Sequence, residues 1–198
     1  MPIISGSGSG GGGGVGSVSL VYRYTVSGVD KASIDTGVDA ASAGSGDWTN
    51  GDVLEIFAVV RTDDAGALVN PTIRLNNDSG ANYSLQNVVG ANTTASAGAL
   101  VGSNQWSTGI LVHGSGGSAS GTTALAFVFP NYTGTTFIKT GGVTGYSSDS
   151  GGAANNDVRV SALGYFSTSA ITRFSIAAAG GQKLKVGSQV LVYKRSSA

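Results

Sequence analysis

The residues that could carry acid–base or nucleophilic chemistry are few in this chain. It has one histidine, His113, and no cysteine, which excludes disulfides, thiol chemistry and thiolate metal sites. A serine hydrolase needs a base beside its nucleophile, and no Gly-x-Ser-x-Gly motif stands between an expected strand and a helix. We therefore interpret His113 as a residue at the end of a strand or on the surface.

Carboxylates are the other candidates, because a depolymerase of the glycosidase type needs two of them about 5–10 Å apart. Asp63 and Asp64 follow an apolar segment and precede Ala-Gly, as residues of a turn do. Glu55 lies inside that apolar segment, where an unpaired charge is costly, so we expect a structural ion pair with Arg74 or Arg23. These patterns predict no catalytic residue, no cofactor and no enzymatic activity.

Two further motifs have ordinary structural interpretations. Residues 76–80, Asn-Asn-Asp-Ser-Gly, offer oxygen ligands but lack the spacing and the final Glu of an EF-hand. A turn is the better interpretation, with calcium held between loops as the alternative. The glycine run at residues 10–14 matches G-x-G-x-x-G, but it follows no strand and opens no helix, so it predicts no nucleotide site.

The charge balance bears on the class of partner. Acidic and basic residues number 11 each, and only 11% of the chain is charged, against about a quarter in typical soluble proteins. No basic field is available to attract nucleic acid. No apolar run reaches the roughly 18 residues that a membrane span needs. We therefore expect neither nucleic-acid binding nor membrane insertion.

The composition favours strands. Hydrophobic residues make up 40% of the chain, and no stretch repeats them at the i, i+3, i+4, i+7 spacing of a helix. We predict an all-β protein, a jelly-roll-like antiparallel β-sandwich of about 8–11 strands. It forms a single domain at residues 17–198, preceded by an extended Gly-rich N-terminal arm at residues 1–16.

The apolar and β-branched segments locate the expected strands. The apolar run at residues 53–61 is typical of a central strand buried on both faces. Small-residue segments between the strands predict long loops at residues 40–51, 88–108, 114–121 and 141–156. The main strands are expected at residues 17–26, 53–61, 72–75, 123–129, 135–139, 157–166, 171–177 and 183–193, and shorter ones at 32–35, 83–87 and 110–113.

The N-terminal arm carries a short apolar segment in front of a Gly/Ser tract. Such a tract behaves as a flexible tether. One interpretation is a disordered leader. The other is an anchor that docks on a partner protein, formed by Pro2, Ile3, Ile4, Ser5 and Gly6.

Aromatic residues in or beside the expected loops are candidates for binding. Trp48, Trp106 and Tyr146 could stack on sugars or contact a partner protein. They could equally cap the core of the sandwich, and the sequence leaves both interpretations open.

Several segments resemble a group of small virion proteins of tailed bacteriophages. The shared pattern is an N-terminal Ile-Ser-Gly and Gly run, a long apolar strand, an Arg-Leu-Asn-Asn-Asp-Ser-Gly-Ala-Asn-Tyr segment, Pro-x-Tyr-x-Gly-Thr-Thr-Phe, Thr-Arg-Phe and a final Gly-x-x-Val/Leu-Val-Tyr strand. Here these stand at residues 4–14, 53–61, 74–83, 130–137, 172–174 and 187–193. The resemblance implies a jelly-roll-like module on the particle exterior, often homotrimeric, on capsid, fibre or tail tip.

The resemblance and the missing catalytic set together predict a non-enzymatic virion structural protein. We expect a capsid decoration or head-fibre subunit that forms a homotrimer and docks on other virion proteins through its N-terminal arm. The alternative is a tail-fibre or tail-tip module that recognises host surface glycan through its loop aromatics.

Overall fold

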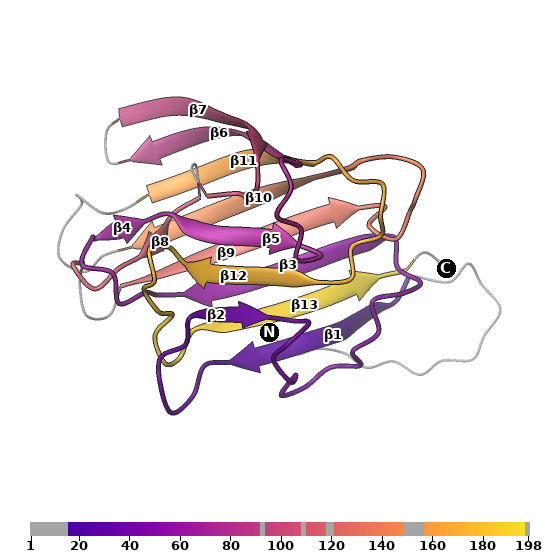
Figure 1. Cartoon of the computed structure of the whole chain (residues 1–198), viewed down its shortest axis with the longest axis horizontal. Helices are drawn as coiled ribbons and strands as arrows, with labels where there is room; N and C mark the ends of the chain where they lie inside the picture. The colour runs from indigo at the N-terminus through magenta and orange to yellow at the C-terminus, as the bar shows by residue number, and fades with distance from the viewer. Residues whose placement is uncertain (1–15, 92–93, 108–109, 118–120, 149–156, 197–198) are drawn as a thin grey trace.

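The computed structural model describes residues 16–91, 94–107, 110–117, 121–148 and 157–196. These residues form thirteen strands joined by turns and loops, and none of them is helical (Figure 1). Accordingly, no helix in this part of the chain is long and apolar enough to cross a membrane. The predicted all-β class is confirmed.

Eight strands form one fully antiparallel sheet, which Figure 1 shows from β1 at the lower edge to β7 at the upper edge. Each strand pairs with its neighbours in continuous register, apart from irregularities in β1 and at the β6–β7 pair. In spatial order the strands are β1 (Val18–Thr25), β13 (Gln189–Arg195), β3 (Val53–Val60), β9 (Thr122–Pro130), β10 (Lys139–Ser148), β11 (Asp157–Tyr165), β6 (Tyr83–Ala91) and β7 (Thr94–Ser103).

Two smaller sheets accompany the large one. A three-stranded sheet lies in front of it in Figure 1 and runs in the order β2 (Ser33–Asp35), β12 (Phe174–Ala178) and β5 (Pro71–Leu75). A two-stranded sheet joins β4 (Leu68–Val69) to β8 (Val112–His113). The protein is therefore a β-sandwich with one wide and one narrow layer.

The hydrophobic core fills the space between the two layers. Alternate residues of β3 point inward, and Leu54 and Ile56 are fully buried. Phe127 of β9 meets Phe174 of β12 with ring centroids 5.4 Å apart, which joins the two layers directly. Burying side chains of this size contributes about 1.5–3 kcal/mol each relative to leaving them in water.

Strands far apart in the sequence pair in a nested order. β1 pairs with β13, β2 with β12 and β3 with β9. Innermost in this series, Ile73 of β5 forms an antiparallel bridge with Trp106. The hairpins β6–β7 and β10–β11 stand outside the series and widen the large sheet beyond β9.

Two expected loops contain strands, which raises the strand count above the predicted 8–11. β7 lies within the expected loop 88–108, and β10 occupies much of the expected loop 141–156. Both strands consist largely of Gly, Ala, Ser and Thr, so neither shows the apolar alternation that marks a half-buried strand. The expected strand at residues 135–139 is also wrong, because only its last residue belongs to β10.

The expectation that the segment at residues 53–61 is buried on both faces is wrong as well. β3 is central in its sheet, but the small sheet covers only one side of it. On the other side Phe57 and Val59 remain about 40% exposed. A continuous apolar run therefore marks a central strand here without marking a second covering layer.

Candidate functional site

The predicted site residues are separated in the structure. Pro2, Ile3, Ile4, Ser5 and Gly6, the expected anchor, lie outside the described residues. The three aromatic candidates belong to different environments and do not form one binding surface.

Trp106 is completely buried. Its indole Nε1 donates a hydrogen bond to the Ser84 carbonyl oxygen at 2.8 Å, and its ring lies against Tyr83 and Phe129. Its backbone exchanges two hydrogen bonds with Ile73. The structure therefore contradicts a glycan or partner contact at Trp106, because no face of the ring reaches the surface.

The other two aromatic candidates keep some exposure. Trp48 is partly buried and packs against the edge of the core. Tyr146 belongs to β10 and is 53% exposed on the side of the large sheet that faces away from the core. Of the three, Tyr146 alone presents a largely exposed ring.

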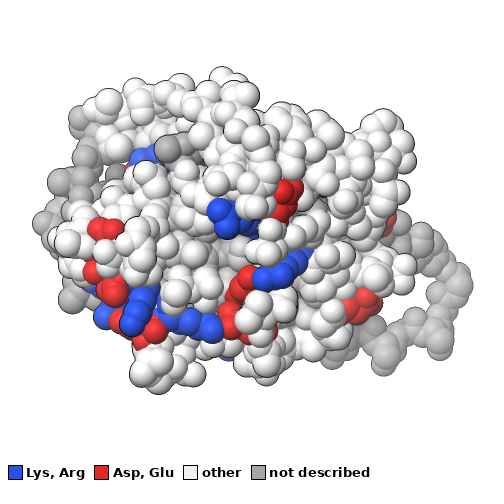
Figure 2. Space-filling view, viewed as in Figure 1, with Lys and Arg blue, Asp and Glu red and all other residues white. Residues whose placement is uncertain are grey.

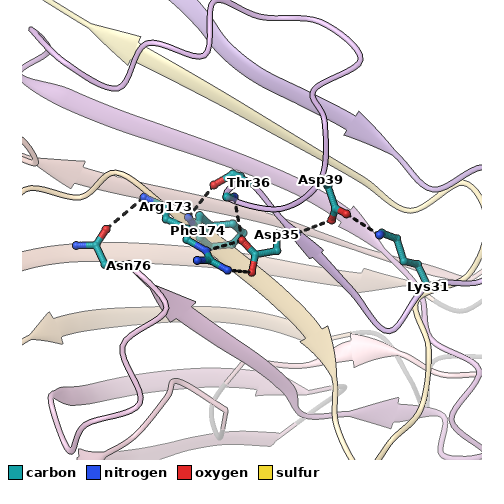
Figure 3. Close-up of polar contacts among 8 residues, drawn as sticks. Lys31, Asp35, Thr36, Asp39, Asn76, Arg173 and Phe174 are labelled. Atoms are coloured by element: carbon teal, nitrogen blue, oxygen red, sulfur yellow. Dashed lines mark hydrogen bonds and ion pairs between the residues drawn. The ribbon is translucent and has the colours of Figure 1, made fainter.

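An ion-pair network crosses the small sheet, and Figure 3 shows its contacts. Arg173, just before β12, donates from Nε and a terminal nitrogen to the two carboxylate oxygens of Asp35 at 2.7 and 2.6 Å. The Gly37 backbone N–H donates to the same carboxylate at 2.9 Å. Burial alone would raise the pKa of Asp35, but the hydrogen bonds from Arg173 and Gly37 outweigh it and hold that pKa below its usual value.

The network continues on both sides of this pair. The Asp39 carboxylate accepts hydrogen bonds from the Asp35 backbone N–H and from Lys31 Nζ (Figure 3). Asn76 follows β5, and its side-chain oxygen accepts from the backbone N–H groups of Thr172 and Arg173. These bonds join β2, β12 and β5, so the cluster stabilises the small sheet. The Asp35 carboxylate has both oxygens occupied and holds its charge, which does not suit a general acid.

The carboxylates singled out in the sequence are also engaged in structural contacts. Asp64 accepts from the Gly66 backbone N–H, which confirms the expected turn, and Asp63 accepts from the backbone N–H of Lys183, which is distant in sequence. Glu55 pairs with Arg195, at 2.9 and 3.3 Å, and the expected partners were wrong. That pair joins residues 140 positions apart, so no local pattern could have indicated it.

The expected turn at residues 76–80 is confirmed. Asp78 accepts from the Gly80 backbone N–H at 2.7 Å and from the Asn82 side chain at 2.8 Å. The hydrogen bond from Gly80 contributes most to a pKa of Asp78 below its usual value. Among the residues described, no three His, Cys, Asp or Glu side chains gather as a metal site would require.

Two buried polar side chains lie beside loops. His113 ends β8 and is fully buried, so of the two expected placements the strand end is confirmed and the surface is not. Glycines at 117 and 121 leave room for its ring, because a Cβ at either would lie within 2.3 Å of it. Lys139 donates to the carbonyl oxygens of Gly134, Phe137 and Thr168. Burial lowers the pKa of Lys139.

The outward side of the large sheet has a different chemistry. Cross-strand partners place Phe57, Ala126, Thr144, Val160 and Val88 in one row from β3 to β6. A parallel row contains Val59, Ala124, Tyr146, Val158 and Gly90. A third runs from Glu55 through Val128, Gly142, Ala162 and Gln86. We call the outward surface of β9, β10, β11, β6 and β7 the neutral face.

The neutral face carries no charged side chain among the described residues. Its valines at 88, 128, 158 and 160 are between 42% and 61% exposed. From β9 to β7 the neutral face spans about 19 Å across the strands. A shallow groove of about 290 Å³ crosses β7, β6 and β11 on this surface, and its lining includes Gln86, Ala99 and Val101.

Charge is concentrated elsewhere. Figure 2, viewed from the small-sheet side, shows the charged groups gathered mainly over the lower half of the molecule. The paired residues of the small-sheet side include Lys31, Asp35, Asp39 and Arg173. The charge distribution thus separates a polar, internally paired side from the neutral face.

Comparison with known proteins adds no assignment. Neither the protein-family models, nor the curated proteins, nor the solved structures contain a match to this chain.

Proposed function

We propose that this protein is a non-enzymatic structural subunit of a tailed-bacteriophage particle, exposed on the particle exterior as a capsid decoration or head-fibre protein. In this proposal the N-terminal arm, residues 1–16, attaches the subunit to other virion proteins. The sandwich is the part displayed, and three copies assemble as the resemblance implies.

The neutral face carries the proposal. Soluble monomers rarely expose continuous apolar patches larger than a few hundred Å², and such patches usually mark contacts with other proteins. Here the exposed valines lie on neighbouring strands of an antiparallel sheet, with no charge between them among the described residues. A surface of this kind suits permanent contact within an assembly better than free solution.

The nested strand pairing supports the jelly-roll-like part of the proposal. A jelly roll arises when a long antiparallel ribbon folds over, so that the first strand pairs with the last and each inner strand with its counterpart. The pairs β1–β13, β2–β12, β3–β9 and the Ile73–Trp106 bridge follow that order.

Co-sedimentation with virus particles that lack the protein tests the proposal. We expect the purified protein to pellet with the particles, and binding to be lost when residues 1–16 are removed. Val160→Lys places a charge in the neutral face and should weaken binding. Val29→Lys is the matched control, because Val29 is 77% exposed away from this face. A protein that never pellets with particles contradicts the proposal.

A receptor-binding module is the second candidate, and the exposed ring of Tyr146 favours it. An exposed aromatic side chain on an uncharged surface can stack on a sugar ring. In that case the protein should bind host cells, Tyr146→Ala should abolish the binding and Tyr146→Phe should retain it. Pelleting with particles and not with cells excludes this role.

A further inference from the structure

The two edge strands of the large sheet differ in how they are protected from pairing with another chain. At the β1 edge a loop covers the strand: the backbone N–H groups of Ser42, Ser45 and Gly46 donate to carbonyl oxygens of β1. The register of β1 also shifts between Leu20 and Tyr22, and Arg23 places a charge on the strand. Bulges, charges and covering loops are the devices that prevent a sheet edge from pairing with another chain.

β7, at the opposite edge, also has a register shift, but it lies beyond Leu100, and residues 94–100 have little of this protection. It is ten residues long, contains no charged residue and no proline, and pairs with β6 alone among the described strands (Figure 1). Residues 94–99 are exposed throughout, so no loop of the described chain covers them. Half of the backbone N–H and C=O groups of such an edge point away from the sheet and can accept a further strand.

The sequence of β7 makes a second copy of this chain the fitting occupant. We propose that β7 pairs antiparallel with β7 of a second copy, about a two-fold axis at Ala97. The register with β6 is regular from Ala91↔Thr94 to Leu85↔Leu100, and Ala97 is the midpoint of residues 94–100. Self-pairing about Ala97 sets Ser96 opposite Gly98 and Ala95 opposite Ala99, with no charge facing a like charge and no bulky pair.

Pairing about this axis also leaves the neutral faces of the two copies on the same side of the joined sheet. Ala97 lies in the row of Val88 and Val160, so it belongs to that surface. A two-fold axis normal to the sheet keeps the same face of both copies on one side. The two eight-stranded sheets then become one continuous sheet, and their neutral faces form one surface of twice the area.

This contact rests on β7 and not on the proposed function, so it holds whether or not the protein belongs to a virus particle. The two-fold contact between β7 strands is separate from the three-fold contacts of a trimer. Trimers that also formed the β7 contact would associate in multiples of two trimers. The outcome of co-sedimentation with virus particles is independent of the outcome of the two solution experiments below.

The first experiment measures the mass of the intact protein in solution by light scattering after size-exclusion chromatography. We expect an even number of protomers for the wild type and half that mass for Ala97→Lys, because two ammonium groups would then face each other across the axis. Val29→Lys should keep the wild-type mass. Circular dichroism checks that each variant is folded. A wild type of one or three protomers, or a mass unchanged by Ala97→Lys, overturns the proposal.

The second experiment uses the lack of cysteine in this chain. Directly opposed residues of an antiparallel pair have Cα atoms about 4.5–5.5 Å apart, which fits a disulfide. Ala97→Cys should therefore form a covalent dimer under mild oxidation, seen on a non-reducing gel, whereas Val29→Cys should stay mostly monomeric on that gel. Equal cross-linking of the two variants would falsify pairing about Ala97. If the β7 edge were found paired with a strand of a different protein, the β7–β7 dimer could not form, and that result would also overturn the proposal.

Discussion

The small-sheet side and the neutral face use side chains for opposite purposes. On the small-sheet side, opposite charges are paired within the chain, and the pair of Asp35 and Arg173 links β2 to β12. Within the described part of the chain, the neutral face carries no charge, and its valines at 88, 158 and 160 are exposed. The comparison teaches that the charges of the small-sheet side are paired within the chain, while the neutral face leaves apolar side chains exposed.

The largest effect on the free energy of unfolding is expected for a core substitution in β3, and it can be compared with a substitution on the other side of the same strand. Ile56 and Phe57 are neighbours in β3, but Ile56 is fully buried and Phe57 is 40% exposed. Ile56→Ala should lower the free energy of unfolding by about 2–5 kcal/mol, because it leaves a cavity in the core. Phe57→Ala removes a larger side chain but should cost under about 1.5 kcal/mol. Urea denaturation of both variants measures the difference, and equal losses would show that the outward side is covered too.

A variant that weakens the ion-pair network should have an intermediate effect on the free energy of unfolding, and this effect should depend on pH. Asp35→Asn should cost about 1–3 kcal/mol at pH 7, because the variant weakens a charge-assisted pair that is only partly exposed. The folded-state pKa of Asp35 is lowered, so its contribution is present above the unfolded value of about 3.9. That contribution disappears as the pH falls through the lower folded-state pKa.

Urea denaturation of wild type and Asp35→Asn at pH 7 and pH 2.5 measures this dependence. The gap between the two proteins should narrow at the lower pH. Lys185→Met is the control, since the Lys185–Asp30 pair is more exposed and should contribute under about 1 kcal/mol. A gap that is independent of pH would contradict a charged Asp35 in the folded protein.

The smallest effect on stability is expected on the neutral face. Val160→Lys changes an exposed position and should alter the free energy of unfolding by only about 0.5 kcal/mol. Its effect should instead be on assembly, as described for particle binding. A loss of stability as large as that of Ile56→Ala would mean that Val160 is packed within the subunit.

The parts of the fold that could be predicted are those where apolar side chains alternate or form a continuous run. β1, β3, β9 and β11 are rich in apolar and β-branched residues, and their expected bounds lie within a residue or two of the observed ones. β7 and β10 could not be found in this way, because Ala, Gly, Ser and Thr carry almost no hydrophobic contrast between the two sides of a strand.

The candidate site shows a second limit. Tyr146 and Trp106 both lie in segments rich in small residues, and nothing local indicates that one ring is exposed and the other buried. The burial of Trp106 depends on its bridge to Ile73, which is distant in sequence. Long-range pairing of this kind decides which aromatic residues face solvent, and a single sequence does not display it.

The nested pairing also has a kinetic consequence. β13 lies between β1 and β3 in the large sheet, so the first strand cannot join the rest until the last has been synthesised. Contacts of such high sequence separation slow folding and leave strand edges exposed meanwhile. On the ribosome, β1 must therefore wait for more than 160 residues before its partner appears at residue 189. The sandwich is assembled late, in a step that inserts β13 and closes the sheet.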